Sequence, residues 1–153
     1  MSRHSEQPQS TSAVERIESG SELLAMIIRR QFARPGINFF TPSDLSQQLA
    51  FMCHPAGKVI QPHVHNSVPR EVVYTQEVLF LRQGRLRVDF YDQDQTYLYS
   101  RVLEGGDVIL LVKGGHGFEV LEEIEMFEVK QGPYAGDRDK TRFDGIRPAE
   151  VRV

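Results

Sequence analysis

The sequence predicts an all-β fold, a sandwich or a barrel of short antiparallel strands. Two runs, 77–81 and 86–90, alternate apolar and polar residues with the two-residue period of a half-buried strand, and 82–85 forms a turn between them. Further turn-forming residues separate short β-rich runs at 92–94, 104–107, 113–115 and 122–123. Short strands that are regularly punctuated in this way are typical of sandwiches and barrels.

The N-terminal part predicts a tail and one helix. Residues 1–13 are polar and predict a flexible tail, so a single domain spans residues 14–153. Residues 19–22 resemble a capping box, and Leu23, Leu24, Ile27 and Ile28 then recur at helical spacing. The apolar stretch is too short to cross a bilayer, so we expect the helix to pack on the domain or on a second subunit.

His63 and His65 are expected on extended backbone. Pro62 disfavours helical conformation in the residue before it. Residues two apart on a strand share a face, with their side-chain bases roughly 7 Å apart. Two imidazoles at that separation can bind one ion, although two histidines on a solvated strand face are the simpler interpretation.

Two more residues favour a metal site. Glu77 opens the first alternating run, and His116 lies in the glycine-rich segment 114–117. A set of nitrogen ligands with one carboxylate suits a borderline divalent metal. The simpler interpretation of Glu77 is a surface carboxylate paired with Arg82 or Arg85.

The spacing of these residues resembles the two motifs of the cupin superfamily. Gly57, His63, His65, Glu77 and Gly84 match the first motif, and the segment from Gly106 to His116 resembles the second. The resemblance spans residues 57–131 and implies a double-stranded β-helix, or jelly-roll barrel. It also implies that a divalent transition metal is bound by His63, His65, Glu77 and His116.

The chain departs from the cupin pattern at four places. The gap from His65 to Glu77 is longer than usual, which implies an extended loop or a hairpin. In the second motif Val112 stands where proline is common, His116 comes one residue early, and Val120 replaces the usual asparagine. Residues 128–134 resemble small bacterial cupins related to sugar-modifying ones.

Three functions remain open from the sequence. A site of three imidazoles and one carboxylate leaves positions open on iron, manganese or nickel but nearly saturates zinc, which favours an oxygenase or a related small-molecule enzyme. A metal-independent nucleotide-sugar epimerase or ketoisomerase would use His63 or His65 as its base and Tyr74 or Tyr97 as an acid. A non-enzymatic module would bind an anionic ligand through basic groups.

Four charged residues are candidates for ligand binding: Arg70, Arg87, Glu128 and Lys130. Charged residues on strands usually face water, which is the simpler interpretation of each. Glu128 and Lys130 share one strand face. They point into the pocket if Met126 is inward, and into solvent if Phe127 and Val129 are inward.

Composition limits the kinds of binding partner and the cellular location that we expect. The chain has 153 residues, 40% of them hydrophobic, which suits one domain with a substantial core, and a formal net charge of -3, which argues against a general nucleic-acid binder. We expect no signal peptide and no membrane segment. The single cysteine, Cys53, excludes an intrachain disulfide, so we expect a cytoplasmic protein with Cys53 in the core.

A β-rich edge with Ile37, Phe39 and Phe40 predicts a homodimer.

Overall fold

The structure, a computed structural model, describes residues 12–153 as eight β-strands and two short 3-10 turns, with no α-helix in that range. The strands are β1 (Val14–Ser19), β2 (Glu22–Ile28), β3 (Gly36–Phe39), β4 (Ala50–Cys53), β5 (Glu77–Tyr91), β6 (Tyr97–Glu104), β7 (Val108–Leu111) and β8 (Gly115–Lys130), and the turns are η1 (Gly136–Asp139) and η2 (Pro148–Glu150). The prediction of an all-β fold is confirmed. Of the predicted tail, residues 1–11 lie outside the described residues, and the Ala13 carbonyl accepts a hydrogen bond from the Arg29 N–H at 2.8 Å.

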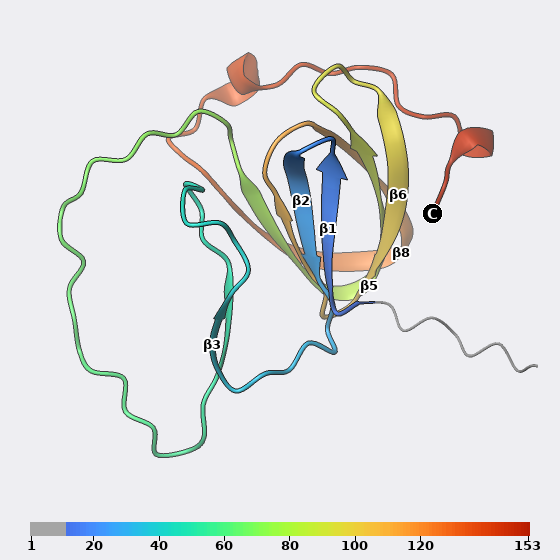
Figure 1. Cartoon of the computed structure of the whole chain (residues 1–153). Helices are drawn as coiled ribbons and strands as arrows, with labels where there is room; N and C mark the ends of the chain where they lie inside the picture. Colours follow the sequence, from blue (N-terminus) through green and yellow to red (C-terminus); the bar gives the residue numbers. More distant parts are fainter. Residues whose placement is uncertain (1–11) are drawn as a thin grey trace, which may run out of the picture.

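Six strands form one antiparallel sheet that curls strongly on itself into an open half-barrel (Figure 1). Its order is β1-β2-β7-β5-β6, and β8 pairs with β5. The first half of β5 pairs with β7 and its second half with β6, on the same edge, while β8 runs along the other edge. β5 is therefore the central strand. Strands β3 and β4 form a separate two-stranded sheet.

The predicted N-terminal helix is wrong, because its residues form β2. Gly20, at φ +59°, turns the chain between β1 and β2, which pair from Val14 opposite Ile28 to Ser19 opposite Glu22. The whole run from Leu24 to Ile28 is buried, so both faces of β2 are covered, and its two edges pair with β1 and β7. A strand buried on both faces is a continuous apolar run, which periodicity does not separate from a buried helix.

The predicted turns at 82–85 and 122–123 are also wrong, since β5 and β8 both continue through them. β5 bends at Gly84, which has φ +90°. A Cβ atom on Gly84 would clash with the carbonyl oxygen of Glu123, and the register between β5 and β8 shifts at this point. Glycine thus allows the two paired strands to bend together without ending.

The apolar core lies on one face of the curled sheet. It is built by strands β1, β2, β5, β6 and β7, with Leu81, Val88, Phe90, Leu103 and Ile109 all at most 1% exposed. Leu79 belongs to this core and Met126 packs against it. Both side chains also line the cavity described below, so the cavity is an extension of the core.

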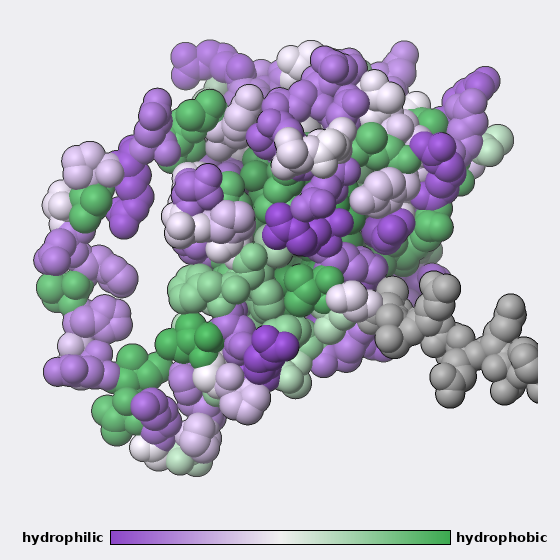
Figure 2. Space-filling model, in the orientation of Figure 1, coloured by the Kyte–Doolittle hydropathy of each residue, from purple (hydrophilic) through white to green (hydrophobic). Residues whose placement is uncertain are grey.

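The segment between β4 and β5, residues 54–76, contains no strand and swings away from the curled sheet (Figure 1). In the space-filling view this arm stands clear of the main body and mixes hydrophilic and hydrophobic residues (Figure 2). The backbone around His63 and His65 is therefore outside any sheet, and the long gap before Glu77 is a loop rather than a hairpin. Cys53, at the end of β4, is exposed, so its predicted place in the core is wrong.

The C-terminal strap, residues 136–153, runs across one end of the sheet. The Tyr91 hydroxyl accepts a hydrogen bond from the Ile146 N–H at 2.8 Å, and the Tyr97 hydroxyl accepts one from the Arg152 N–H at 2.8 Å. The Ser100 N–H donates to the Arg152 carbonyl at 2.7 Å. The strap is thus fixed to β5 and β6. Neither this strap nor any other part of residues 12–153 contains a helix long and apolar enough to cross a membrane.

Candidate functional site

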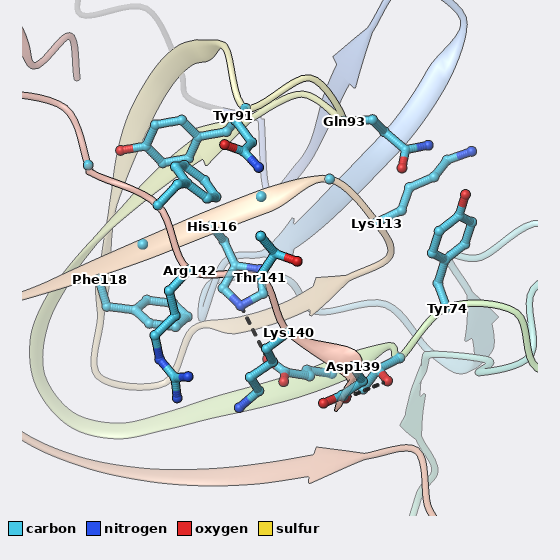
Figure 3. Close-up of a pocket in the computed structure, with 18 of the residues that line it drawn as sticks. Tyr74, Tyr91, Gln93, Lys113, His116, Phe118, Asp139, Lys140, Thr141 and Arg142 are labelled. Carbon is cyan, nitrogen blue, oxygen red and sulfur yellow. Dashed lines mark hydrogen bonds and ion pairs between the residues drawn. The ribbon is translucent and has the colours of Figure 1, made fainter. Parts of the chain in front are cut away.

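A cavity of about 700 Å³ opens where β5 begins. Its walls come from β5, from the turn between β7 and β8, from both ends of β8 and from the strap (Figure 3). Leu79, Met126, Phe118 and Phe143 contribute apolar surface. Charged and hydroxyl groups surround that surface: Tyr74, Thr75, Glu77, Tyr91, Asp92, Lys113, His116, Glu128, Lys130, Asp139, Lys140, Thr141 and Arg142. A partly apolar cavity with a few convergent polar groups is the usual form of a small-molecule site.

Glu77 and His116 meet in this cavity, and Figure 3 shows His116 among the lining residues. The Nε2 atom of His116 lies 3.4 Å from the Oε2 atom of Glu77, and their side chains are 30% and 12% exposed. The two residues stand at opposite ends of the ladder between β5 and β8, where Glu77 pairs with Lys130 and His116 with Phe90. Only the curl of the sheet brings the two ends together, so the fold itself assembles this pair.

The simpler interpretation of Glu77 as a partner of Arg82 or Arg85 is wrong. Arg82 pairs instead with Glu125 at 2.5 Å, and Arg85 pairs with carboxylates of β6 and β8 on the exposed side. The side chain that pairs with the Glu77 carboxylate is therefore His116.

The surroundings of Glu77 lower the pKa of its carboxyl group. The hydrogen bond with His116 is the largest cause, burial opposes it, and the positive charges of Lys130 and Lys140 lower the pKa further. Glu77 is therefore a carboxylate at neutral pH. It fixes the orientation of the imidazole through Nε2 and leaves Nδ1 as the ring nitrogen not engaged with Glu77.

The geometry of this pair suits two ligands of one metal ion. A nitrogen and an oxygen that bind one ion at about 2.1 Å lie roughly 3.0–3.4 Å apart, and the observed separation is 3.4 Å. Within residues 12–153, however, no three His, Cys, Asp or Glu side chains come together as a ligand cluster. The pair thus supplies half of the predicted ligand set.

The other half, His63 and His65, lies on the exposed arm and does not line the cavity. The two rings are close, with centroids 5.2 Å apart, and Nδ1 of His63 lies 3.0 Å from the Gln61 carbonyl oxygen. The structure therefore brings the four predicted ligands together as two pairs, not as one centre.

The inward face of the last strand is that of Met126, Glu128 and Lys130, all three of which line the cavity. Phe127 and Val129 are 59% and 61% exposed. Of the two orientations left open by the sequence, the inward one is correct. Lys130 and Glu128 also pair with each other at 3.5 Å.

The remaining candidate residues from the sequence differ in whether they line the cavity. Tyr74 lines the cavity, whereas Arg70 is exposed on the arm. The Tyr97 hydroxyl is hydrogen-bonded to the Ser100 hydroxyl at 2.8 Å and to the Arg152 N–H of the strap. Arg87 is held by Asp89 at 2.8 Å and by Glu119, and it is not among the residues that line the cavity.

The sequence gives little sign of the strap residues at the cavity. Lys140, Thr141, Arg142 and Phe143 follow no strand or helix period, and only the anchoring of the strap on Tyr91 places them there. The Phe143 ring packs edge-on against Tyr91 with centroids 5.0 Å apart. A Cβ atom on Gly115 would lie 2.9 Å from the Phe143 ring, so the glycine next to His116 makes room for the strap. Gly115 was therefore the one feature of the sequence that indicated a close approach of another segment to the start of β8.

Comparison with known proteins finds no relative: no protein family, no curated protein and no solved structure matches the chain.

Proposed function

We propose that the chain is a metal-binding protein of the cupin type whose cavity takes a small sugar-like or acidic molecule. One observation carries the proposal. Glu77 and His116, two of the predicted ligands, meet inside the cavity at 3.4 Å although they stand at opposite ends of the β5–β8 ladder. The curled antiparallel sheet is compatible with the jelly-roll barrel that the proposal requires.

His63 and His65 complete the site, on this proposal, when residues 57–65 add to the free edge of β8. In the described part of the chain β8 pairs only with β5, so this strand of 16 residues keeps one edge of unpaired backbone groups. The arm carries exposed apolar side chains, with Val59 at 78% and Val64 at 84% exposure. Adding a strand to the edge would satisfy backbone groups and bury part of that apolar surface.

The length of the arm permits this docking. Glu77, which begins β5, is fixed at the cavity. The eleven residues 66–76 that precede it can span up to about 36 Å when extended. His65 is therefore within reach of His116 without any change in the curled sheet.

Several residues of the chain have defined roles in such a site. Glu77 stays ionised beside a cation, and it orients the His116 ring. Leu79 and Met126 exclude water from one side, and the hydroxyls of Tyr74 and Thr141 can hydrogen-bond to a bound molecule. A bound iron, manganese, nickel or zinc ion would supply a Lewis acid or, for the redox-active metals, an electron-transfer centre.

The same pair of residues favours a second function, a metal-independent epimerase or ketoisomerase. A carboxylate that engages one imidazole nitrogen leaves the other as a general base, which can remove a proton from the carbon beside a carbonyl. In this case His116 is the base, rather than His63 or His65, because His116 alone of the three lines the cavity. Tyr74, which also lines the cavity, is the acid that returns a proton.

Metal analysis of protein purified without added metal separates the two functions. We expect about one equivalent of a transition metal in the wild type and its loss in His63→Ala and Glu77→Ala. His54→Ala is the matched control, since His54 lies on the same arm but outside the predicted ligand set. Loss of metal only in Glu77→Ala would contradict the docking of the arm, and absence of transition metal from the wild type would contradict the metal proposal.

Activity measurements then separate catalysis from binding. Oxygen uptake with small acids as substrates supports an oxygenase. Exchange of solvent deuterium into a keto-sugar, abolished by His116→Gln and retained in metal-free protein, supports the isomerase. Stabilisation by a small molecule without turnover would leave a binding module.

A further inference from the structure

Four basic side chains line the cavity from three different elements: Lys113, Lys130, Lys140 and Arg142. Two of them already have a close carboxylate. Lys113 pairs with Glu22 at 2.9 Å, and Lys130 pairs with Glu128 at 3.5 Å.

The two cations on the strap are compensated much less. Among residues 12–153, Arg142 pairs only with Asp137, at 3.1 Å, and both side chains are at least 75% exposed, so water largely screens this pair. Lys140 has no carboxylate oxygen within 4.0 Å among residues 12–153. The charge of Lys140 acts on Glu77, whose carboxylate is engaged by His116. Four carboxylates line the cavity, those of Glu77, Asp92, Glu128 and Asp139, and none of them lies within 4.0 Å of the charged group of Lys140 or Arg142. The strap therefore holds two cations at the cavity that no lining carboxylate pairs with directly.

These cations are held in place rather than carried on a loose end. Phe143, next to Arg142, packs on Tyr91, and the Ile146 N–H donates to the Tyr91 hydroxyl at 2.8 Å. On the other side Thr75 donates a hydrogen bond to Asp139 at 3.0 Å, next to Lys140. The strap is thus anchored on both sides of Lys140 and Arg142. Figure 3 shows Lys140 and Arg142 with His116 among the residues that line the cavity.

We propose that the cavity selects a small organic anion, whose carboxylate or phosphate group is bound by Lys140 and Arg142 while the rest of the molecule faces His116 and Glu77. This names the substrate class of the proposed function and rests on it for the reacting site. Arginine binds such groups through two parallel N–H donors and lysine through a point charge, so the two residues together suit a carboxylate or a phosphate. The lining carboxylates away from the strap, those of Glu77, Asp92 and Glu128, repel an anion in their part of the cavity, which favours ligands that place their negative charge at Lys140 and Arg142.

The test compares pairs of probes that differ in one anionic group: glucose 6-phosphate with glucose, and benzoate with benzyl alcohol. Binding is measured by calorimetry on the full chain, once with metal loaded and once with metal removed by chelation. We expect the anionic member of at least one pair to bind at least about tenfold more tightly than its neutral partner. The pair that discriminates identifies the group as a phosphate or a carboxylate.

Variants locate the anion on the strap. The double variant Lys140→Gln/Arg142→Gln is expected to lose the preference for the anionic probe. Arg138→Gln is the matched control, because Arg138 lies on the same strap and outside the cavity lining, with its Nε donating to the Ala135 carbonyl at 3.3 Å. This control should bind the anionic probe like the wild type, and circular dichroism checks that all variants fold.

Three results would each overturn the inference. The anionic and neutral probes could bind equally, no anionic probe could bind at all, or Arg138→Gln could lose the preference for the anionic probe as much as the double variant does. Metal content is measured on the same samples. A protein that holds metal but ignores the anionic group would refute this inference alone, and one that selects the anion without holding metal would refute the metal proposal alone.

Discussion

The Nε2 atom of His116 lies 3.4 Å from a carboxylate oxygen of Glu77 whose side chain is only 12% exposed. The contact holds the pKa of Glu77 below its ordinary value of 4.5, chiefly through the hydrogen bond with His116. An acid whose pKa is lower in the folded than in the unfolded state adds stability at pH values above its unfolded pKa. That contribution is lost as the pH falls through the folded pKa. The candidate site therefore links the stability of the fold to pH.

Glu77→Gln is expected to lower the free energy of unfolding by about 1 kcal/mol near pH 7, since it removes a half-buried charged hydrogen-bond partner. The difference from the wild type should shrink as the pH falls below about 4.5, where the unfolded carboxyl takes up a proton, and should go on shrinking until the folded carboxyl is protonated at its lower pKa. Urea unfolding at about pH 7 and about pH 3 measures both differences. Glu18→Gln is the control, because Glu18 pairs with Arg16 at 46% exposure and should change stability little. A loss that is the same at both pH values would contradict an origin in the ionised carboxylate.

The sequence predicts well those parts of the fold whose physical signal is local. Strands β6 and β7 lie between the turn-forming residues predicted at 92–94, 104–107 and 113–115, which bound the two strands on both sides. β2 was missed because a strand covered on both faces loses its alternation. The turn expected at Gly84 was wrong for another reason: glycine marks both turns and bends within a strand, and only the partner strand β8 decides between them.

For the site, the sequence predicted some of the contacts and missed others. Glu77 and His116 meet as expected, and the inward orientation of Glu128 and Lys130 follows from that of Met126. His63 and His65 do not join them in the structure. Lys140 and Arg142 reach the cavity through a tertiary contact of the strap, which no local sequence pattern encodes.

Tyr91→Phe should loosen the strap. The Ile146 N–H would lose its acceptor, while the Tyr91 ring would still pack on Phe143. We expect amide hydrogen exchange at Ile146 to become about fivefold faster, as for the loss of one hydrogen bond. Tyr99→Phe is the matched control, since no side-chain hydrogen bond to the Tyr99 hydroxyl exists within residues 12–153. Unchanged exchange at Ile146 in Tyr91→Phe would show that the strap is held by other contacts.

Gly84→Ala tests the bend of β5. The new methyl group would meet the carbonyl oxygen of Glu123, and the backbone would also be held at φ +90°, so we expect a loss of at least about 2 kcal/mol in the free energy of unfolding. Gly57→Ala is the control, because Gly57 has a similar φ of +86° but no atom within 4 Å of the added Cβ. Its cost should be about 1 kcal/mol or less. Chemical denaturation of the two variants measures the difference, and equal losses would mean that strain alone, rather than the close approach of β8, requires glycine at position 84.

The predicted homodimer has a defined surface to test. In the β3–β4 sheet, Ile37 pairs with Met52, and these two side chains and that of Phe39 are 58–64% exposed. Phe40 instead packs on Phe32 with ring centroids 4.9 Å apart, so it is not free for a partner. Phe39→Asp should convert a dimer to a monomer in size-exclusion chromatography with light scattering. Val153→Asp, a change at an equally exposed residue of the strap, should leave the mass unchanged, and a wild type that is monomeric would contradict the prediction.

The arm that carries His63 and His65 is expected to contribute little to stability and to dock on β8 when metal binds. Both side chains are exposed and outside the core, so His63→Ala should leave the stability of the metal-free protein unchanged within about 0.5 kcal/mol. If the arm docks on β8 around a metal, addition of metal should slow amide exchange in residues 57–65 and along 115–122 of the wild type, because both segments gain backbone partners. His63→Ala should show neither protection. Slower exchange at β8 without any change in residues 57–65 would mean that Glu77 and His116 bind the metal alone, with the arm remaining where the structure places it.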